Sequence, residues 1–154
     1  MDYFDIVTKA VLSTSSDAII ASDQEGKITF WNPGAERIFG YASGDAIGQS
    51  LDIIVPERLR KRHWRGYYQV IQSGESRYGH GDILSVPAIR QDGTQISIEF
   101  TILPLINEAA ELIGLAAILR DVTPRFEEMR ALKRRLIERT EVSPHEALVP
   151  ELRA

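Results

Sequence analysis

The sequence contains no cysteine, and this absence excludes several kinds of site at once. Disulfides, thiolate catalysis, cysteine-ligated zinc, iron–sulfur clusters and cysteinyl–flavin photochemistry all need a thiol. A chain without disulfides is compatible with a reducing compartment, so we expect a cytoplasmic location.

Long apolar runs and a basic leader are also missing. The first residues, MDYFDIVTKAVL, are acidic where a signal peptide is basic, and no apolar run approaches the roughly 18 residues that a membrane span needs. Positive charge is not in excess either, since the net charge is −4, which argues against nucleic acid as a general partner. We therefore expect neither a membrane nor a nucleic acid as partner.

What the 154 residues do contain is the pattern of a single α+β domain. In TQISIEFTIL, apolar and polar residues alternate, which is typical of a sheet with one buried face. Together the β-rich runs predict a five-stranded antiparallel sheet with short helices and one long helix on one face. The predicted strands are residues 18–22, 27–31, 82–90, 94–106 and 112–122.

Helices are expected in the middle of the chain and at both ends. Asn32 is a suitable N-cap for a short helix, and a longer helix is expected between Pro56 and Gly74. The terminal segments MDYFDIVTKAVL and RFEEMRALKRRLIERT have the periodicity of amphipathic helices. The predicted organisation is a flanking helix at 1–14, a domain at 15–123, a signalling or dimerisation helix at 124–140 and a disordered tail at 141–154.

Three segments of the chain resemble those of the PAS domain family: DAIIASDQEGKITFWNPGAERIFGYASGDAIGQSL, AIRQDGTQISIEF and GLAAILRDVT. They match the family's opening hairpin and next helix, its charged hairpin turn, and its last strand. Residues 121–123, Asp-Val-Thr, match the usual exit into a C-terminal helix. The resemblance implies a PAS fold and a sensory or dimerising module. Such modules bind haem, a flavin, a small metabolite or nothing, between the long helix and the sheet.

The long helix carries one histidine on its apolar side. Residues three and four apart stack on a helix, so one face is formed by Leu59, His63, Tyr67 and Val70. The basic residues lie opposite, with either Arg60 or Lys61 among them. His63 is therefore expected to point towards the sheet, and Gly66 leaves a gap beside it. A neutral imidazole aimed into an apolar slot is what a haem iron needs.

The resemblance to haem-PAS sensors of oxygen and redox state points the same way. Their proximal histidine lies on this helix in an R-x-x-H context, and PERLRKRHW aligns His63 with it. Their distal arginine aligns with Leu84, or with Ile83 after a one-residue shift, and other distal positions align with Phe100 and Ile102. The resemblance thus implies haem b in an apolar pocket, with basic residues of the helix near the propionates. Without a guanidinium to stabilise bound O₂, we expect CO or NO as the gas ligand. The candidate cofactor-binding residues are Leu59, His63, Gly66, Tyr67, Leu84, Phe100 and Ile102, with His63 as the metal ligand.

A structural role for His63 is the alternative. PAS domains with no known haem carry a similar RHRxGYxxxxxSGE helix, and RHWRGYYQVIQSGE resembles that pattern too. His63 would then hydrogen-bond a backbone carbonyl or a neighbouring strand, and the domain would bind no cofactor, or a flavin. The other two histidines, His80 and His145, are expected in a loop and in the tail.

The remaining patterns favour a binding module over an enzyme. No Ser–His–acid order, phosphate-binding loop or paired carboxylates stand out. The terminal helices carry apolar stripes that a lone PAS core does not bury, which predicts a parallel homodimer. These stripes are Val7–Val11 and Phe126–Met129–Leu136. The chain is then either a fragment of a longer signalling protein or a stand-alone protein that acts on an unknown downstream partner.

Overall fold

The computed structural model describes residues 1–75 and 84–141. The chain divides into two compact units, and the boundary lies after Asp121. The elements, in order, are α1 (Tyr3–Leu12), β1 (Ala18–Asp23), β2 (Ile28–Trp31), α2 (Pro33–Phe39), α3 (Ser43–Ala46), the 3₁₀ turns η1 (Leu51–Ile54) and η2 (Glu57–Leu59), α4 (Arg60–Ser73), β3 (Leu84–Ile89), β4 (Gln95–Ile106), β5 (Leu112–Asp121) and α5 (Thr123–Glu141).

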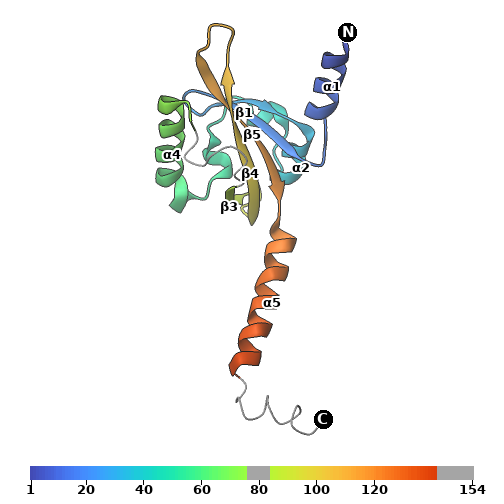
Figure 1. Ribbon diagram of the computed structural model, residues 1–154, viewed down its shortest axis with the longest axis vertical. Coiled ribbons are helices and arrows are strands. Elements are labelled where there is room, and N and C mark those ends of the chain that lie inside the picture. Colours follow the sequence, from blue (N-terminus) through green and yellow to red (C-terminus); the bar gives the residue numbers. More distant parts are fainter. Residues whose placement is uncertain (76–83, 142–154) are drawn as a thin grey trace. The chain divides into compact units, whose positions relative to one another are not determined.

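The five strands form one antiparallel sheet in the order β2-β1-β5-β4-β3 (Figure 1). The predicted fold class is confirmed, and the observed strands lie within about two residues of the predicted ranges. The predicted third strand began at Asp82, which lies outside the described residues. Strands β4 and β5 make the longest pairing, from Ile98 opposite Asp121 to Ile106 opposite Leu112.

Asn32 connects α2 to the start of the sheet, as its predicted capping role requires. Its side-chain oxygen accepts hydrogen bonds from the backbone N–H groups of Ala35 (2.9 Å) and Ile19 (2.7 Å). Its amide nitrogen donates to the carbonyls of Thr14 (3.1 Å) and Asp17 (3.0 Å). A buried amide with all these partners satisfied costs little and fixes the approach of α2 to β1.

The core lies between one face of the sheet and the helices that precede β3. Alternate residues of each strand point to this inner face, because side chains in a strand alternate in direction. The inner face includes Ala18, Ile20, Ile98, Leu115 and Leu119, and it packs with Ile38, Phe39, Tyr67 and Val70 of the helices. Trp31 is also buried, and its indole N–H donates to the carbonyl of Tyr41 (3.0 Å).

Helix α4 begins later than the sequence predicts. Pro56 has an extended backbone (ψ 137°), and a 3₁₀ turn precedes the first α-helical residue, Arg60. The helix ends at Gly74 as predicted, in the left-handed conformation (φ 69°), with its N–H bonded to the carbonyl of Val70 (2.8 Å). Within residues 1–75 and 84–141, the helices all fall short of the length and apolarity that crossing a membrane requires.

Candidate functional site

The inward side of α4 brings together most of the predicted helix residues. Tyr67 and Val70 are buried, and His63 is half-buried one turn before Tyr67. Leu59, in η2, is half-buried and packs against the core. Gly66 is exposed, and a methyl group built on its Cα would meet no atom within 4 Å, so the space beside it opens to solvent.

The His63 imidazole has no hydrogen bond to any described residue. Its Nδ1 is buried without a partner, and the ring lies 4.8 Å from the Trp64 ring and 6.0 Å from the Tyr67 ring, between centroids. The backbone bond that a structural role predicts is therefore not found among residues 1–75 and 84–141. Burial lowers the pKa of His63, and the nearby Asp52 carboxylate opposes this only in part, so the imidazole is neutral at pH 7. A buried polar atom without a partner needs an explanation in a folded protein.

Tyr67 ties α4 to the end of β1. Its hydroxyl donates to the backbone carbonyl of Asp23 and pairs with Ser22 Oγ at 2.8 Å. Both side chains are buried, so these bonds form away from water. Burial raises the pKa of Tyr67 above its ordinary value, which keeps the hydroxyl protonated.

Trp64 is a contact residue that the sequence analysis missed. Its indole N–H donates to Asp52 Oδ1 in η1 (2.7 Å). The ring also covers Gly26 in the β1–β2 turn so closely that a Cβ there would lie 2.1 Å from two ring carbons. The one signal in the sequence was the tryptophan itself, which stands where the RHRxGY pattern has arginine.

Arg60 is half-buried and turns inward, whereas Lys61 is exposed. Lys61 is therefore the one of the two that lies with the other basic residues on the outer side of the helix. The Nε of Arg60 lies 3.9 Å from Asp52 Oδ1, and its guanidinium donates to the carbonyls of Val55 (3.2 Å) and Asp52 (3.3 Å). Asp52 thus accepts from two residues of α4 and lies close enough to His63 to affect its pKa. Nothing in the spacing of the sequence indicates this role for Asp52.

The sheet side of the site is apolar. Leu84 of β3 pairs with Phe100 of β4, and Ile102 pairs with Ala117 of β5, so all these residues point to the inner face. Leu84, Phe100 and Ile102 are half-buried. Each offers only carbon atoms to whatever lies above the sheet. The alternative distal residue Ile83, like His80 and His145, lies outside the described residues.

The donor chemistry of these residues fits a haem. An iron porphyrin takes a neutral imidazole from the protein and an apolar cover, and His63 with the inner-face residues supplies both. Among residues 1–75 and 84–141, no group of three or more His, Asp or Glu side chains is placed to hold a bare metal ion. A porphyrin carries its own four nitrogen ligands, so one protein histidine suffices for it.

Comparison with known proteins agrees with this architecture. A family model described as the PAS fold matches residues 8–122. An uncharacterized protein of Azorhizobium caulinodans is 33% identical over 129 residues, which cover 82% of this chain and 17% of that protein. The sensor protein FixL of Bradyrhizobium diazoefficiens is 33% identical over 94 residues, which cover 61% of this chain and 18% of that protein. The chain therefore spans less than a fifth of the length of these relatives.

A solved structure is similar along most of the chain. The crystal structure of a PAS domain from Colwellia psychrerythraea aligns with a TM-score of 0.68 at 25% sequence identity. The alignment covers 80% of this chain and 99% of that domain.

Proposed function

Since the chain belongs to the PAS family of sensory signal-transduction modules, we propose that it binds a small ligand or cofactor between α4 and the inner face of the sheet, with haem b held by His63 as the first candidate. The observation that carries the proposal is the buried Nδ1 of a neutral imidazole, which has no hydrogen-bond partner in the described part of the chain. A PAS domain is a sensory domain and typically has no catalytic activity of its own.

The residues proposed to form this site have different roles. A bound haem iron supplies a position for a diatomic gas or for a change of redox state. His63 would hold the group, and the apolar side chains of Leu84, Phe100 and Ile102 on the sheet would help to exclude water from it. None of these three side chains can donate a hydrogen bond, so a haem in this site would favour CO or NO over O₂, whose bound form a hydrogen-bond donor stabilises.

An absorption spectrum tests this proposal. The full chain is purified with haem supplied, and we expect a Soret band that is lost in His63→Ala. His145→Ala is the matched control, because it removes a histidine outside the region that matches the PAS model, and it should keep the band. A colourless protein that does not take up added haem contradicts the proposal. Absorption bands of a flavin would identify a flavin, and not haem, as the cofactor.

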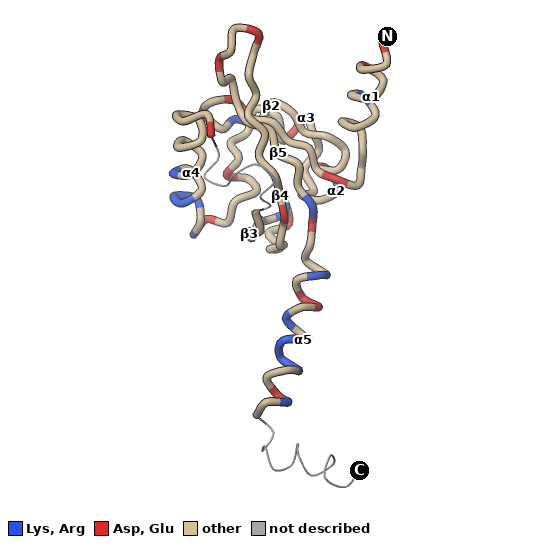
Figure 2. Tube along the Cα trace, viewed as in Figure 1, with Lys and Arg blue, Asp and Glu red and all other residues tan. Residues whose placement is uncertain are grey.

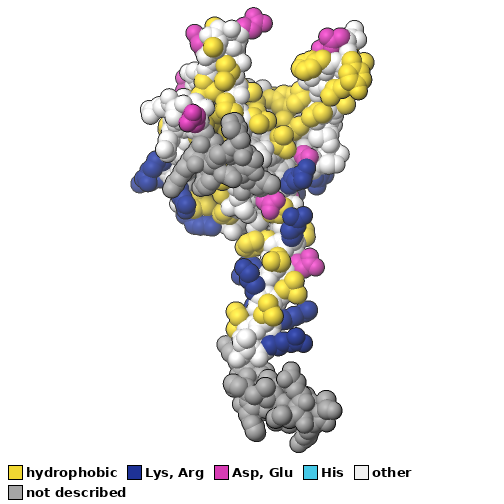
Figure 3. Space-filling model, in the orientation of Figure 1, with side chains coloured by type: hydrophobic (Ala, Val, Ile, Leu, Met, Phe, Trp, Pro, Cys, Tyr) yellow, Lys and Arg dark blue, Asp and Glu magenta, His cyan; other side chains and the backbone are white. Residues whose placement is uncertain are grey.

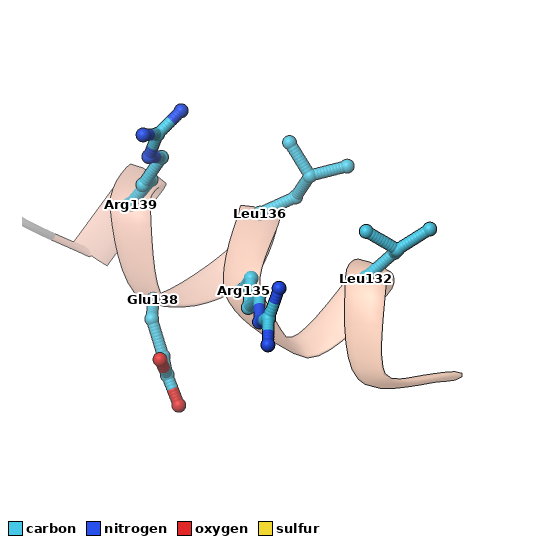
Figure 4. A pocket seen from close by; sticks show the side chains of 5 residues that line it. All are labelled: Leu132, Arg135, Leu136, Glu138 and Arg139. Atoms are coloured by element: carbon cyan, nitrogen blue, oxygen red, sulfur yellow. The ribbon is translucent and has the colours of Figure 1, made fainter. Parts of the chain in front are cut away.

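Dimerisation without a cofactor is the second candidate, and exposed apolar side chains favour it. On α1, Phe4 is 75% exposed, and Val7 and Val11 are also exposed. Figure 3 shows hydrophobic side chains on the surface at the N-terminal end of the chain. On α5, Leu132 and Leu136 project from the same side of the helix, one turn apart, with Glu138 on the other side (Figure 4). A second copy of the chain would cover such stripes. Light scattering at micromolar concentration tests this, and a monomer mass contradicts it.

A further inference from the structure

The start of α4 breaks an electrostatic rule that α1 and α2 follow. The N-terminus of a helix carries a partial positive charge, so acidic residues stabilise the first turn and basic residues the last. Helix α1 has Asp5 in its first turn and Lys9 in its last, and α2 has Glu36 and Arg37 in those places. Helix α4 has no acidic residue in its first turn and no basic residue in its last. It begins with three basic residues in succession, residues 60–62, and the acidic residue that precedes them is Glu57, in the 3₁₀ turn that leads directly into the helix.

Four cations in and before this helix point away from the core. At 100° per residue they fall on one side of the helix, within roughly 10 Å along its axis. All are exposed, and we call them the basic face: Arg58, Lys61, Arg62 and Arg65. Arg58 donates to Gln95 Oε1 (3.1 Å). In the part of the chain that is described, no carboxylate lies within 4 Å of a basic-face nitrogen. Figure 2 shows how these charges gather in the N-terminal half of α4.

This arrangement is unfavourable for the isolated domain. Like charges one turn apart repel, and the helix dipole adds to the repulsion. A local conflict of this kind is expected where a residue serves another purpose. We propose that the basic face of α4 is a docking surface for an acidic segment of a partner protein. The carboxylates of such a segment would pair with the cations and relieve their repulsion.

The size of the patch favours a protein segment over nucleic acid. Proteins that bind duplex DNA commonly neutralise about 6–10 phosphates, whereas this face offers four cations on two helical turns. The rest of the chain brings the net charge to −4, which repels a long polyanion but tolerates a short acidic peptide. The basic face is exposed, whereas His63 lies on the inward side of the same helix.

Binding of a fluorescent deca-glutamate peptide to the full chain tests the proposal. The variant K61Q/R62Q/R65Q should bind roughly tenfold more weakly, because three exposed ion pairs are lost. The matched control R130Q/R134Q/R135Q removes the same charge from α5, where Glu127, Glu128 and Glu138 lie among the basic residues, and should stay within about twofold of wild type. Equal weakening of both variants overturns the proposal, as does the absence of binding at about 1 mM peptide.

Two further measurements locate the bound peptide on the chain and compare it with a nucleic acid of similar charge. In NMR titrations of the wild-type chain, peptide-induced shifts centred on residues 57–69 support the proposal even if the variant folds poorly, and shifts centred on α5 contradict it. A thymidine decanucleotide with a similar number of charges is titrated at the same ionic strength. If it binds the basic face more tightly than the peptide does, a nucleic acid replaces the acidic protein segment as the partner.

Discussion

Helix α1 has a complete capping box and no buried side chain, whereas α4 has no side-chain cap and buries Tyr67 and Val70. In α1, Asp2 Oδ1 accepts from the backbone N–H of Asp5 (2.8 Å), and Asp5 Oδ2 accepts from the backbone N–H of Asp2 (3.3 Å). The stability of α1 therefore comes from its own ends. That of α4 comes from contacts with other elements, because its own first turn is electrostatically unfavourable.

This difference suggests which helix responds to a ligand. Helix α4 is held by a few specific contacts: Trp64 to Asp52 and Gly26, Arg60 to Asp52, and Tyr67 to Ser22 and Asp23. The ligand or cofactor proposed to bind next to His63 would contact the element that these contacts hold. Helix α1 buries no side chain, so a change in the core does not act on it through buried contacts of its own.

The largest expected change in the free energy of unfolding comes from removing the Trp64 ring. Trp64→Ala should lower the free energy of unfolding by about 3 kcal/mol, because a half-buried aromatic ring and its bond to Asp52 are lost. The matched change in α1, Phe4→Ala, should stay within about 0.5 kcal/mol, since Phe4 is mostly exposed. Urea unfolding followed by circular dichroism measures both. If both variants lose the same free energy of unfolding, α4 does not depend on its contacts with other elements more than α1 does.

A methyl group at Gly26 should disturb α4 from the hairpin side. Gly26→Ala places a Cβ 2.1 Å from the Trp64 ring in a backbone with φ +81°, and we expect a loss of about 2 kcal/mol in unfolding free energy. Gly48→Ala is the control, because Gly48 has a similar φ of +91° but no atom within 4 Å of the added Cβ. It should lose only about 1 kcal/mol. If the two variants lose the same amount, the Trp64 contact contributes nothing.

How far the sequence predicts this molecule depends on the range of each interaction. Short motifs predict the sheet, the Asn32 cap and the Gly74 stop, because each depends on neighbouring residues. The inward direction of His63 follows from helical periodicity in the same way. The contacts of Trp64 with Gly26 and Asp52 join three elements far apart in the chain, and no local pattern encodes them. That Nδ1 of His63 has no partner among the described residues is likewise a property of the packed structure alone.

A smaller effect is expected from breaking the cap of α1. Asp2→Ala removes one half of the capping box and should weaken the helix locally by about 1 kcal/mol. Because α1 buries no side chain, the midpoint of global unfolding should not move. Hydrogen exchange should show faster exchange of the Asp5 and Ile6 amides, with unchanged protection in β1 and β5. A global loss as large as the local one would mean that α1 contributes to the core after all.

The smallest expected effect has the opposite sign in the two helices. Lys61→Glu places an acidic residue in the first turn of α4 and should raise the free energy of unfolding by about 0.5 kcal/mol. Lys9→Glu places one in the last turn of α1, where the dipole is negative, and should destabilise that helix locally by a similar amount, about 0.5 kcal/mol. Thermal unfolding at low ionic strength detects the first change, and hydrogen exchange along α1 detects the second. Both effects should shrink as salt is added, because screening weakens exposed charges. If Lys61→Glu destabilises the domain, the basic first turn is a structural requirement of α4, and the conflict on which the docking surface is argued does not exist.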